Sequence, residues 1–345
     1  LQNYCNVAVY YPFDRTLEED MVRHEDRGVL TYRSRFHPKE RIWNRIRIFR
    51  SFRKIREEFQ PDIIFAHVAV EAGKYAAFLS DFYHIPLVLM EHSSTEVSLA
   101  GKVGYYISKY VYGHCDYIAC CSENLKNNLQ QFFPKLKFHV VYNGIQPADI
   151  VSGSGKNYRV EGVTNIVIVG LFYSIDIKGY QFLLPAMRQI LDKGCQAVLH
   201  IVGEGEYREH YMQMAKELGI DKECIFYGDC PRDKVYEIVG QMDFFVSSSI
   251  LECSVVSVQE AMLLGKPVLV TKSGGANSLV TRDTAIVVDK GSTQALAEGM
   301  EEMIRRYGEF DTEKIKEYAE NKFEISHISR QYMEIFYDLA CKDSK

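Results

Sequence analysis

Two carboxylates, Glu252 and Glu260, stand eight residues apart in the second half of the chain. The apolar run 243–248 ahead of them predicts a buried strand, and 255–264 predicts a short helix that stops at Gly265. In an open α/β sheet, ligands bind in the loop that follows the carboxyl end of a strand. Backbone N–H groups at the start of the next helix favour phosphate, whereas carboxylates suit the hydroxyl groups of a ribose and a sugar. The pattern therefore favours a nucleotide-sugar pocket.

The same two glutamates also have an ordinary structural interpretation. A glutamate near a helix start commonly complements the helix dipole without binding a ligand, and two glutamates at this spacing arise often by chance. The surrounding residues favour the ligand site. Ser249 and Glu252 are followed in order by Glu260-Ala261-Met262, by Gly265-Lys266-Pro267-Val268 and by Ser273-Gly274-Gly275.

This order resembles the signature of glycosyltransferase family 4, whose members are retaining enzymes of the GT-B fold that use nucleotide-sugar donors. The resemblance covers most of the chain. In the second half it includes the strand 165–170, the turn Lys178-Gly179, the strand and Gly-x-Gly turn 199–205, and the strand 225–228. In the first half it includes 61–67, Glu91-His92, Cys121-Ser122-Glu123 and Tyr142-Asn143-Gly144.

The resemblance assigns roles to particular residues of this sequence. It implies catalytic roles for Glu252 at the hydroxyls of the transferred sugar, for Lys178 at the departing diphosphate, and for His92 at the sugar or acceptor. It implies donor binding by Glu260 at the ribose. The remaining donor-binding residues are Lys178, the turn glycines Gly203 and Gly205, and the helix-start amides of Ser254, Val255 and Val256. A lone histidine is more often a structural hydrogen bonder than a catalyst, so His92 and the similarly placed His67 keep that alternative.

The sequence departs from the family pattern at two positions. Leu171-Phe172 stand where family members carry a phosphate-clamping arginine, and Ser278 replaces a glutamate that often follows the Gly-Gly pair. Arg232 is a candidate substitute for the missing arginine. Cys253 lies beside Glu252, but without a matching base motif it is interpreted as a small packing residue rather than a nucleophile.

Composition narrows the class of protein. The 345 residues predict two domains, and the net charge of −5 gives no general case for nucleic-acid binding. Nine cysteines without a C-x-x-C pair indicate reduced thiols in a cytoplasm. The sequence shows no membrane span and no signal peptide. No Asp-x-Asp triad stands at a strand end, so we expect no metal site and no cofactor, with a UDP-sugar as the favoured substrate over GDP- or ADP-sugars.

Alternating strand and helix patterns predict an α/β protein. The resemblance implies a GT-B fold, with two Rossmann-like domains that face a central cleft. We expect an acceptor-side domain in 1–150, a linker in 151–157, a nucleotide-sugar domain in 158–322, and a C-terminal helix in 323–345 that crosses back to the first domain. The strand pattern 7–11 resembles the second strand of the family's first domain. This implies that the opening strand and its Gly-rich loop are missing from the sequence.

The segment 41–56 holds seven Lys or Arg residues in sixteen, interleaved with Trp43, Ile46, Phe49 and Phe52. One interpretation is an ordinary helix that packs before the strand 63–65, with its charges solvated. The other is a basic amphipathic helix that docks on anionic lipid. The two are compatible, since one face can pack while the other meets lipid.

Together these features predict a retaining glycosyltransferase (hexosyltransferase type) that moves a sugar from a nucleotide-diphosphate sugar to a hydroxyl acceptor. The expected acceptor is a lipid-linked glycan intermediate of bacterial surface polysaccharide synthesis. The expected location is the cytoplasm, peripherally on the inner face of the cell membrane. The alternatives are a GT-B-fold nucleotide-sugar epimerase, which needs no acceptor, and a non-catalytic sugar-nucleotide-binding protein.

Overall fold

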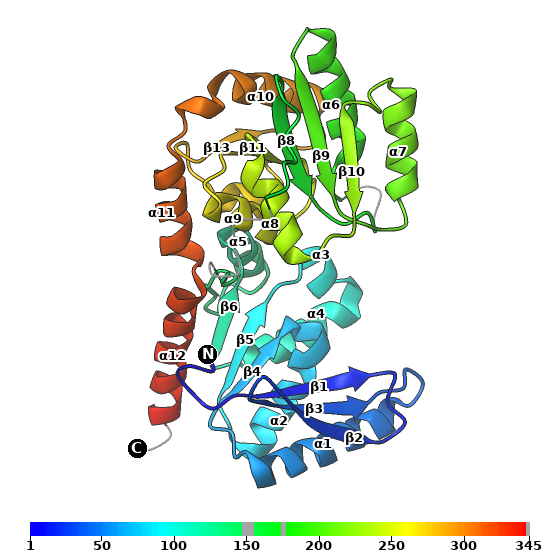
Figure 1. The fold of residues 1–345 in the computed structure, drawn as a ribbon. Coiled ribbons are helices and arrows are strands. Elements are labelled where there is room, and N and C mark those ends of the chain that lie inside the picture. Colours follow the sequence, from blue (N-terminus) through cyan, green and yellow to red (C-terminus); the bar gives the residue numbers. More distant parts are fainter. Residues whose placement is uncertain (147–154, 174–176, 343–345) are drawn as a thin grey trace. The chain divides into compact units, whose positions relative to one another are not determined.

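The computed structural model describes residues 1–146, 155–173 and 177–342, which form two compact units (Figure 1). Unit 1 contains Leu1–Cys121, Lys126–Val141 and the residues from Ser329 on, and unit 2 contains Ser122–Leu125 and Tyr142–Ile328. Residues 151–154 of the expected linker lie outside the described part of the chain. Helix α12 (Ile325–Lys342) begins in unit 2 and belongs to unit 1 from Ser329 on.

Unit 2 is built on one six-stranded parallel sheet in the order β10-β9-β8-β11-β12-β13. Its strands are β8 (Thr164–Val169), β9 (Ala197–Val202), β10 (Cys224–Gly228), β11 (Phe244–Ser247), β12 (Val268–Thr271) and β13 (Ala285–Val288). Its α-helices are α6 (Tyr180–Asp192), α7 (Arg208–Glu217), α8 (Arg232–Gln241), α9 (Val256–Leu263), α10 (Thr293–Arg306) and α11 (Thr312–Phe323). The predicted strands at 165–170, 199–205, 225–228, 243–248 and 267–271 are confirmed, as is the helix at 255–264.

Two apolar layers hold this sheet between its helices. Ile166 and Ile168 of β8 pack with residues of α6, α7 and α10 on one face. Val167, between them in sequence, packs with residues of α8, α9 and α11 on the other face. Because successive strand residues point to opposite faces, a strand covered on both sides needs a continuous apolar run. This explains why the central strands are readable from the sequence.

Unit 1 contains two separate sheets. Strands β4 (Ile64–His67), β5 (Leu87–Glu91), β6 (Tyr117–Cys120) and β7 (His139–Val140) form a parallel sheet in that order. Strands β1 (Ala8–Asp14), β2 (Met21–Asp26) and β3 (Val29–Arg35) form the other, in which β1 runs parallel and β2 antiparallel to β3. The helical elements are α1 (Arg41–Glu58), the π-helical turn η1 (Val68–Gly73), α2 (Lys74–Tyr83), α3 (Thr95–Ser98), α4 (Gly101–Gly113) and α5 (Glu123–Phe132), which belongs to unit 1 from Lys126 on.

The β2–β3 hairpin and the division of the C-terminal helical tail were not predicted. Arg27 and Gly28 join β2 to β3 with φ of 50° and 78°, the pair of positive values that a tight hairpin turn requires. The tail was predicted as one helix that starts at 323, but α11 ends at Phe323 and α12 begins at Ile325. Glu324 between them is extended, and the backbone of Ile145 bonds to both Phe323 and Ile325.

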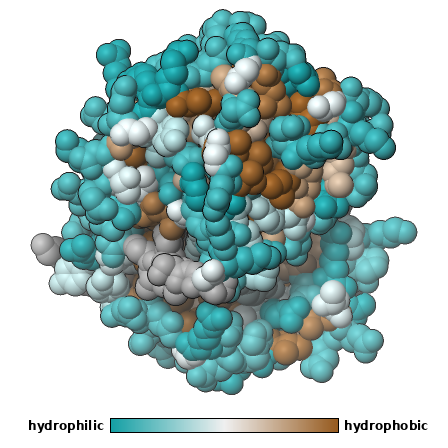
Figure 2. Space-filling model, turned by 45° about the horizontal axis from the view of Figure 1, so that its top comes forward, coloured by the Kyte–Doolittle hydropathy of each residue, from teal (hydrophilic) through white to brown (hydrophobic). Residues whose placement is uncertain are grey.

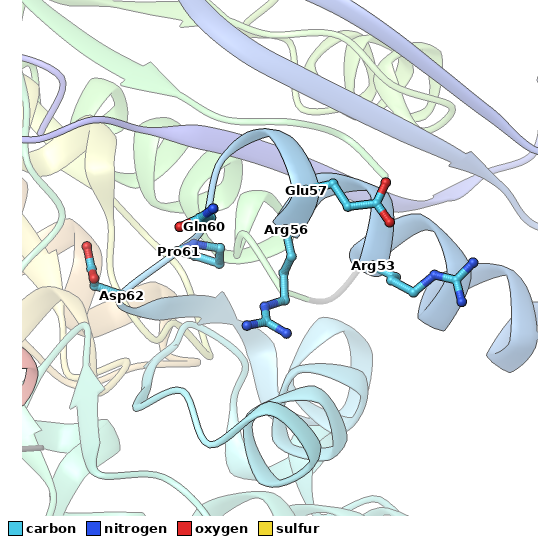
Figure 3. A pocket seen from close by; sticks show the side chains of 6 residues that line it. All are labelled: Arg53, Arg56, Glu57, Gln60, Pro61 and Asp62. Atoms are coloured by element: carbon cyan, nitrogen blue, oxygen red, sulfur yellow. The ribbon is translucent and has the colours of Figure 1, made fainter.

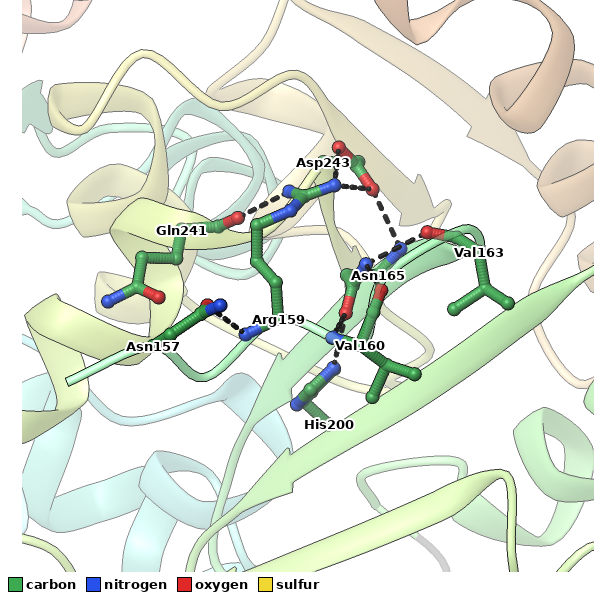
Figure 4. A network of polar contacts seen from close by, with 8 residues as sticks. All are labelled: Asn157, Arg159, Val160, Val163, Asn165, His200, Gln241 and Asp243. Carbon is green, nitrogen blue, oxygen red and sulfur yellow. Dashed lines mark hydrogen bonds and ion pairs between the residues drawn. The ribbon is translucent and has the colours of Figure 1, made fainter.

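A polar network, buried at Asn165 and His200 and exposed at Arg159, ties together the amino ends of β8 and β11, opposite the strand ends where ligands bind in such sheets (Figure 4). Asp243 accepts two hydrogen bonds from Arg159 at 2.9 and 3.0 Å and one from the backbone of Asn165 at 2.7 Å. His200, fully buried, donates from Nε2 to Asn165 Oδ1 at 3.0 Å, because that oxygen can only accept. Its Nδ1 then accepts from the Tyr227 hydroxyl at 2.9 Å.

This network predicts acid destabilisation. Burial, and secondarily the nearby Arg159 charge, lowers the pKa of His200 from 6.5 to about 4. The unfolded chain therefore binds a proton at higher pH than the folded chain, so stability is intact above pH 6.5 and is lost as the pH falls towards 4. The shift corresponds to about 3 kcal/mol in the free energy of unfolding. Urea titrations of wild type and His200→Gln at pH 7 and pH 4 measure it; an equal acid loss in both proteins would contradict the assignment.

Hydrophilic side chains cover most of the face shown in Figure 2, with hydrophobic side chains gathered in a few patches. In the described ranges, no helix combines the length and the hydropathy that crossing a membrane would need.

Candidate functional site

A close backbone approach brings Lys178 to the carboxyl end of β11. Gly179, which caps the start of α6, has φ of 73°, and a Cβ there would lie 1.9 Å from the carbonyl oxygen of Ser248. Only glycine fits such a contact at positive φ. The Ser248 hydroxyl also donates to the carbonyl oxygen of Lys178 at 2.8 Å. The turn after β8 is therefore fastened to the end of β11.

Lys178 and Glu252 form an ion pair. Lys178 Nζ lies 2.7 Å from Glu252 Oε1, and their side chains are 30% and 13% exposed. Ser249 Oγ donates to the same oxygen at 2.9 Å. The Glu252 backbone is fixed as well, since its N–H donates to Ser273 and its carbonyl accepts from Gly275. Within the described part of the chain, Glu252 Oε2 accepts no hydrogen bond and can take a ligand hydroxyl.

Glu260 lies one helical turn into α9 and faces α8. Its Oε1 accepts hydrogen bonds from Arg232 Nη2 at 3.0 Å and from the Tyr236 hydroxyl at 2.8 Å. Burial, and secondarily the bond to Glu260, raises the pKa of Tyr236, so the phenol stays protonated and donates. Arg232 remains about half exposed while Glu260 is mostly buried. The structure thus places the long, half-exposed side chain of Arg232 beside Glu260.

The start of α9 lies between the two glutamates in sequence. Val255 caps the helix in an extended conformation, and its own side chain makes no capping hydrogen bond. The first N–H groups of a helix have no acceptor within it, and they attract anions. Ser254 Oγ accepts from the Asn143 side chain at 3.3 Å, and Val256 is exposed.

Gly203 and Gly205 form a bare turn at the carboxyl end of β9. Their φ values are 148° and 152°. A Cβ on Gly203 would lie 1.9 Å from Gly170 O, and one on Gly205 would lie 2.6 Å from the Phe172 carbonyl carbon. The turn therefore packs backbone against the loop after β8. Within this turn, the Gly203 N–H donates to the carbonyl oxygen of Gly228 at 3.0 Å.

His92 lies in unit 1, directly after β5, and pairs with His67, the last residue of β4. Their rings are parallel within 3°, and His67 Nδ1 lies 2.9 Å from His92 Nε2. Burial, and secondarily the neighbouring His67, lowers the pKa of His92 to about 4. Burial lowers the pKa of His67 as well. Near neutral pH both rings are uncharged and share one hydrogen bond, so His92 can donate or accept but adds no positive charge.

A buried carboxylate shapes the loop around this histidine pair. Glu91, fully buried, accepts hydrogen bonds from the N–H groups of Ala69, His92 and Ser93 and from the Tyr112 hydroxyl. Val68 just before Ala69 has φ of 64°. This is a costly conformation for a β-branched residue. We attribute its persistence to the Glu91 bonds, which hold the chain after β4.

The structure thus brings Lys178 to Glu252, and it brings Arg232 and Tyr236 to Glu260. No sequence motif indicated Tyr236, and Arg232 was only a candidate. The exposed Leu171 supplies no cation where the family pattern has one. Ser278, at the other departure, donates to Gly275 O at 2.8 Å.

A surface pocket of about 540 Å³ lies elsewhere, at the end of α1. Figure 3 shows its lining side chains on the last turns of α1 and the following loop: Arg53, Arg56, Glu57, Gln60, Pro61 and Asp62. Arg56 stacks on the Tyr83 ring, 4.4 Å from its centroid. With cations and carboxylates mixed, the pocket shows no selectivity for a nucleotide.

Two family models match the chain. Residues 2–149 match the model described as Glycosyltransferase Family 4, and residues 164–322 match the model described as Glycosyl transferases group 1.

Individual relatives are about one quarter identical to the chain over the aligned residues. An uncharacterised glycosyltransferase of Methanocaldococcus jannaschii, MJ1607, is 27% identical over 75% of this chain and 71% of its own length. The alpha-monoglucosyldiacylglycerol synthase of Streptococcus pneumoniae is 22% identical over 77% of this chain and 64% of its own length.

Solved structures share the fold. Sucrose-phosphate synthase from Thermosynechococcus elongatus superposes with a TM-score of 0.80 at 16% identity, over 98% of this chain and 90% of its own. Anabaena Alr3699/HepE in complex with UDP superposes with a TM-score of 0.74 at 20% identity, over 85% of this chain and 82% of its own.

Proposed function

The chain is a glycosyltransferase of family 4 with the GT-B fold, and we propose that it transfers a sugar from a nucleotide-diphosphate sugar to a hydroxyl group with retention of configuration. The observation that carries this proposal is the Lys178–Glu252 pair at the carboxyl end of β11. It supplies a cation for a leaving diphosphate next to a carboxylate for sugar hydroxyls. The UDP bound to HepE supports a UDP-sugar as the donor.

Each side chain then has a distinct task. Glu260 binds the ribose hydroxyls through Oε2, and Glu252 binds hydroxyls of the sugar through its own Oε2. The start of α9, with Ser254, Val255 and Val256, holds phosphate oxygens, and the Gly203–Gly205 turn lets the nucleotide approach the backbone.

The chemical step breaks the bond between the anomeric carbon and the diphosphate oxygen. The acceptor oxygen attacks the same face of the sugar, and its proton passes to the departing diphosphate, so no protein nucleophile is required. Lys178 turns from Glu252 to the diphosphate as negative charge develops there. His92, as a neutral ring, hydrogen-bonds the sugar or the acceptor.

Arg232 is the second cation for the diphosphate in this proposal. It stands beside the ribose-binding Glu260, and its exposed guanidinium is long enough to turn towards a neighbouring phosphate. Arg232 would then take the role of the family's phosphate-clamping arginine, whose position Leu171 occupies in this chain.

We also propose a lipid-linked glycan as the acceptor, with the chain in the cytoplasm and peripheral on the inner face of the membrane through α1. The names of two relatives refer to glycolipid and polysaccharide synthesis: the alpha-monoglucosyldiacylglycerol synthase of S. pneumoniae and the teichuronic acid biosynthesis glycosyltransferase TuaC of Bacillus subtilis. These names support the acceptor class.

A thermal-shift panel of UDP-, GDP- and ADP-sugars tests the donor, because a ligand that binds the native state raises the melting temperature. Turnover of the stabilising sugar is then measured with and without a polyprenyl-phosphate-linked acceptor. Turnover without acceptor would favour an epimerase, and donor binding with no turnover would favour a non-catalytic binding protein.

Removing divalent metal should leave donor binding intact. Lys178, Arg232 and the amides of α9 already supply positive charge for the diphosphate. We expect an unchanged UDP affinity in calorimetry with EDTA and with magnesium. Complete loss in EDTA, restored by magnesium or manganese, would contradict the proposed mechanism.

A further inference from the structure

Helix α1 has a packed face and an outer face. Asn44, Ile48, Ser51, Phe52 and Ile55 are buried, which confirms that the helix packs on unit 1. One cation belongs to this packing as well. Arg47 pairs with Glu40 at 2.6 Å and with Asp20 at 3.1 Å, and only 16% of its side chain is exposed.

The outer face carries cations without acidic partners. Arg45, Arg50, Arg53 and Lys54 are all exposed. Within the residues that the structure describes, none of the four lies within 4.0 Å of a carboxylate oxygen. The first turn of the same face adds Ile42 and Trp43, which are 73% and 59% exposed.

Helix α2 extends this surface with aromatic side chains. Phe78 and Phe82, one turn apart, are 51% and 55% exposed. Phe49 of α1 joins the two helices, since its ring lies 4.9 Å from that of Phe82 and 6.4 Å from that of Phe78. We call the four cations with Ile42, Trp43, Phe78 and Phe82 the α1–α2 face.

We propose that the α1–α2 face docks on the surface of an anionic lipid bilayer. Large apolar side chains at such exposure are costly in water, and an interfacial helix buries them at the headgroup–acyl boundary. Tryptophan is enriched at that depth, and cations beside it meet lipid phosphates. A protein interface needs complementary shape, which docking on a bilayer surface does not.

The charges around the face fit this occupant. The exposed acidic residues of α1 and α2 are Glu57, Glu58 and Asp81. Glu58 pairs with Arg23 at 2.9 Å, and Asp81, between Phe78 and Phe82 in sequence, lies 3.4 Å from His114 Nε2. Helix α4 packs beside α2, since the Tyr110 hydroxyl donates to Asp81. It repeats the composition with exposed Lys102, Val103, Tyr106 and Lys109. The chain as a whole has a net charge of −5, so the cations are concentrated here against the overall balance.

This inference deepens the proposed function, on which its biological sense rests, because it names the surface that would bring the site to a lipid-linked acceptor. Its test needs neither donor nor acceptor. Flotation of the full chain with vesicles of phosphatidylcholine, with and without phosphatidylglycerol, measures docking alone. Failure to dock is therefore distinguishable from failure to bind UDP.

Two variants separate charge from insertion. Replacing Arg45, Arg50, Arg53 and Lys54 with Gln should weaken binding to anionic vesicles by about 100-fold or more at low salt, since each cation contributes roughly fivefold. Phe78→Ser with Phe82→Ser should weaken vesicle binding but leave binding to heparin unchanged. Wild-type binding should fall as salt rises.

The matched control removes four exposed cations of unit 2 that likewise have no acidic partner among the described residues: Lys216, Lys222, Arg282 and Lys290. This control has the same net charge as the first variant but leaves the α1–α2 face intact. It should therefore dock like wild type. Equal flotation of all variants would overturn the proposal, as would equal loss of vesicle and heparin binding in the aromatic variant. Circular dichroism and UDP-induced thermal shifts verify that each variant is folded.

Discussion

Replacing Lys178 with alanine should lower kcat by about 10²–10³-fold, the loss expected when one preorganised donor to a developing negative charge is removed. The lysine is held 2.7 Å from Glu252 at the strand end by the Gly179 turn. We expect KM for the donor to rise less than kcat falls, because the diphosphate carries more negative charge in the transition state than in the bound donor. Steady-state kinetics with the donor found by thermal shift measures both constants.

Lys193 provides the matched control. Lys193 also forms an ion pair with a glutamate of unit 2, Glu301. However, it follows the carboxyl end of α6, away from the carboxyl ends of the strands. Lys193→Ala should keep wild-type kcat. If Lys178→Ala and Lys193→Ala had the same activity, Lys178 would be a structural lysine and the diphosphate role would be wrong.

Glu260→Ala should weaken donor binding by about 10- to 150-fold, which corresponds to about 1.5–3 kcal/mol for hydrogen bonds to a charged group. The loss should appear for UDP and for uridine alike, because the ribose is common to both. Arg232→Ala should weaken UDP binding but leave uridine binding nearly unchanged, since its proposed target is the diphosphate. Isothermal titration of both ligands against both variants gives the four affinities.

The double variant Glu260→Ala with Arg232→Ala reports whether Arg232 also acts through Glu260. Arg232 Nη2 and Glu260 Oε1 are 3.0 Å apart. The free-energy effects of substitutions at residues in contact are in general not additive. Tyr236→Phe is a milder control, since it removes one donor to Glu260 and leaves Arg232 in place. An Arg232→Ala variant that lost UDP and uridine affinity equally would show that the arginine only positions the glutamate.

The sequence was sufficient where a local pattern determines the structure. Strands β8 to β12 are continuous apolar runs because both faces of the sheet are covered, and α9 is bounded by Gly265. Strand β13, a short apolar run (AIVV) after a polar segment, was not predicted. The β2–β3 hairpin depends on a positive φ at Arg27, and an arginine in a sequence does not indicate a positive φ.

The site followed the same division. The family resemblance named Glu252, Lys178 and Glu260 individually, but the Lys178–Glu252 pair joins residues 74 positions apart and could not be read from spacing. The stacking of His67 on His92 and the contact of Arg232 with Glu260 are likewise tertiary. The segment 41–56 was ambiguous for a related reason, because burial divides its cations: Arg47 pairs inward while Arg50 does not.

The Gly203–Gly205 turn limits how this enzyme could be re-engineered. A saturation library at either position should return almost no folded members, since even a methyl group would collide with the backbone after β8. If the donor binds there as proposed, the surface that it meets is peptide backbone, whose hydrogen-bonding groups are the same in every variant. A change of donor preference must therefore be sought in the side chains around the turn, and laboratory evolution of the enzyme would have to leave the two glycines fixed.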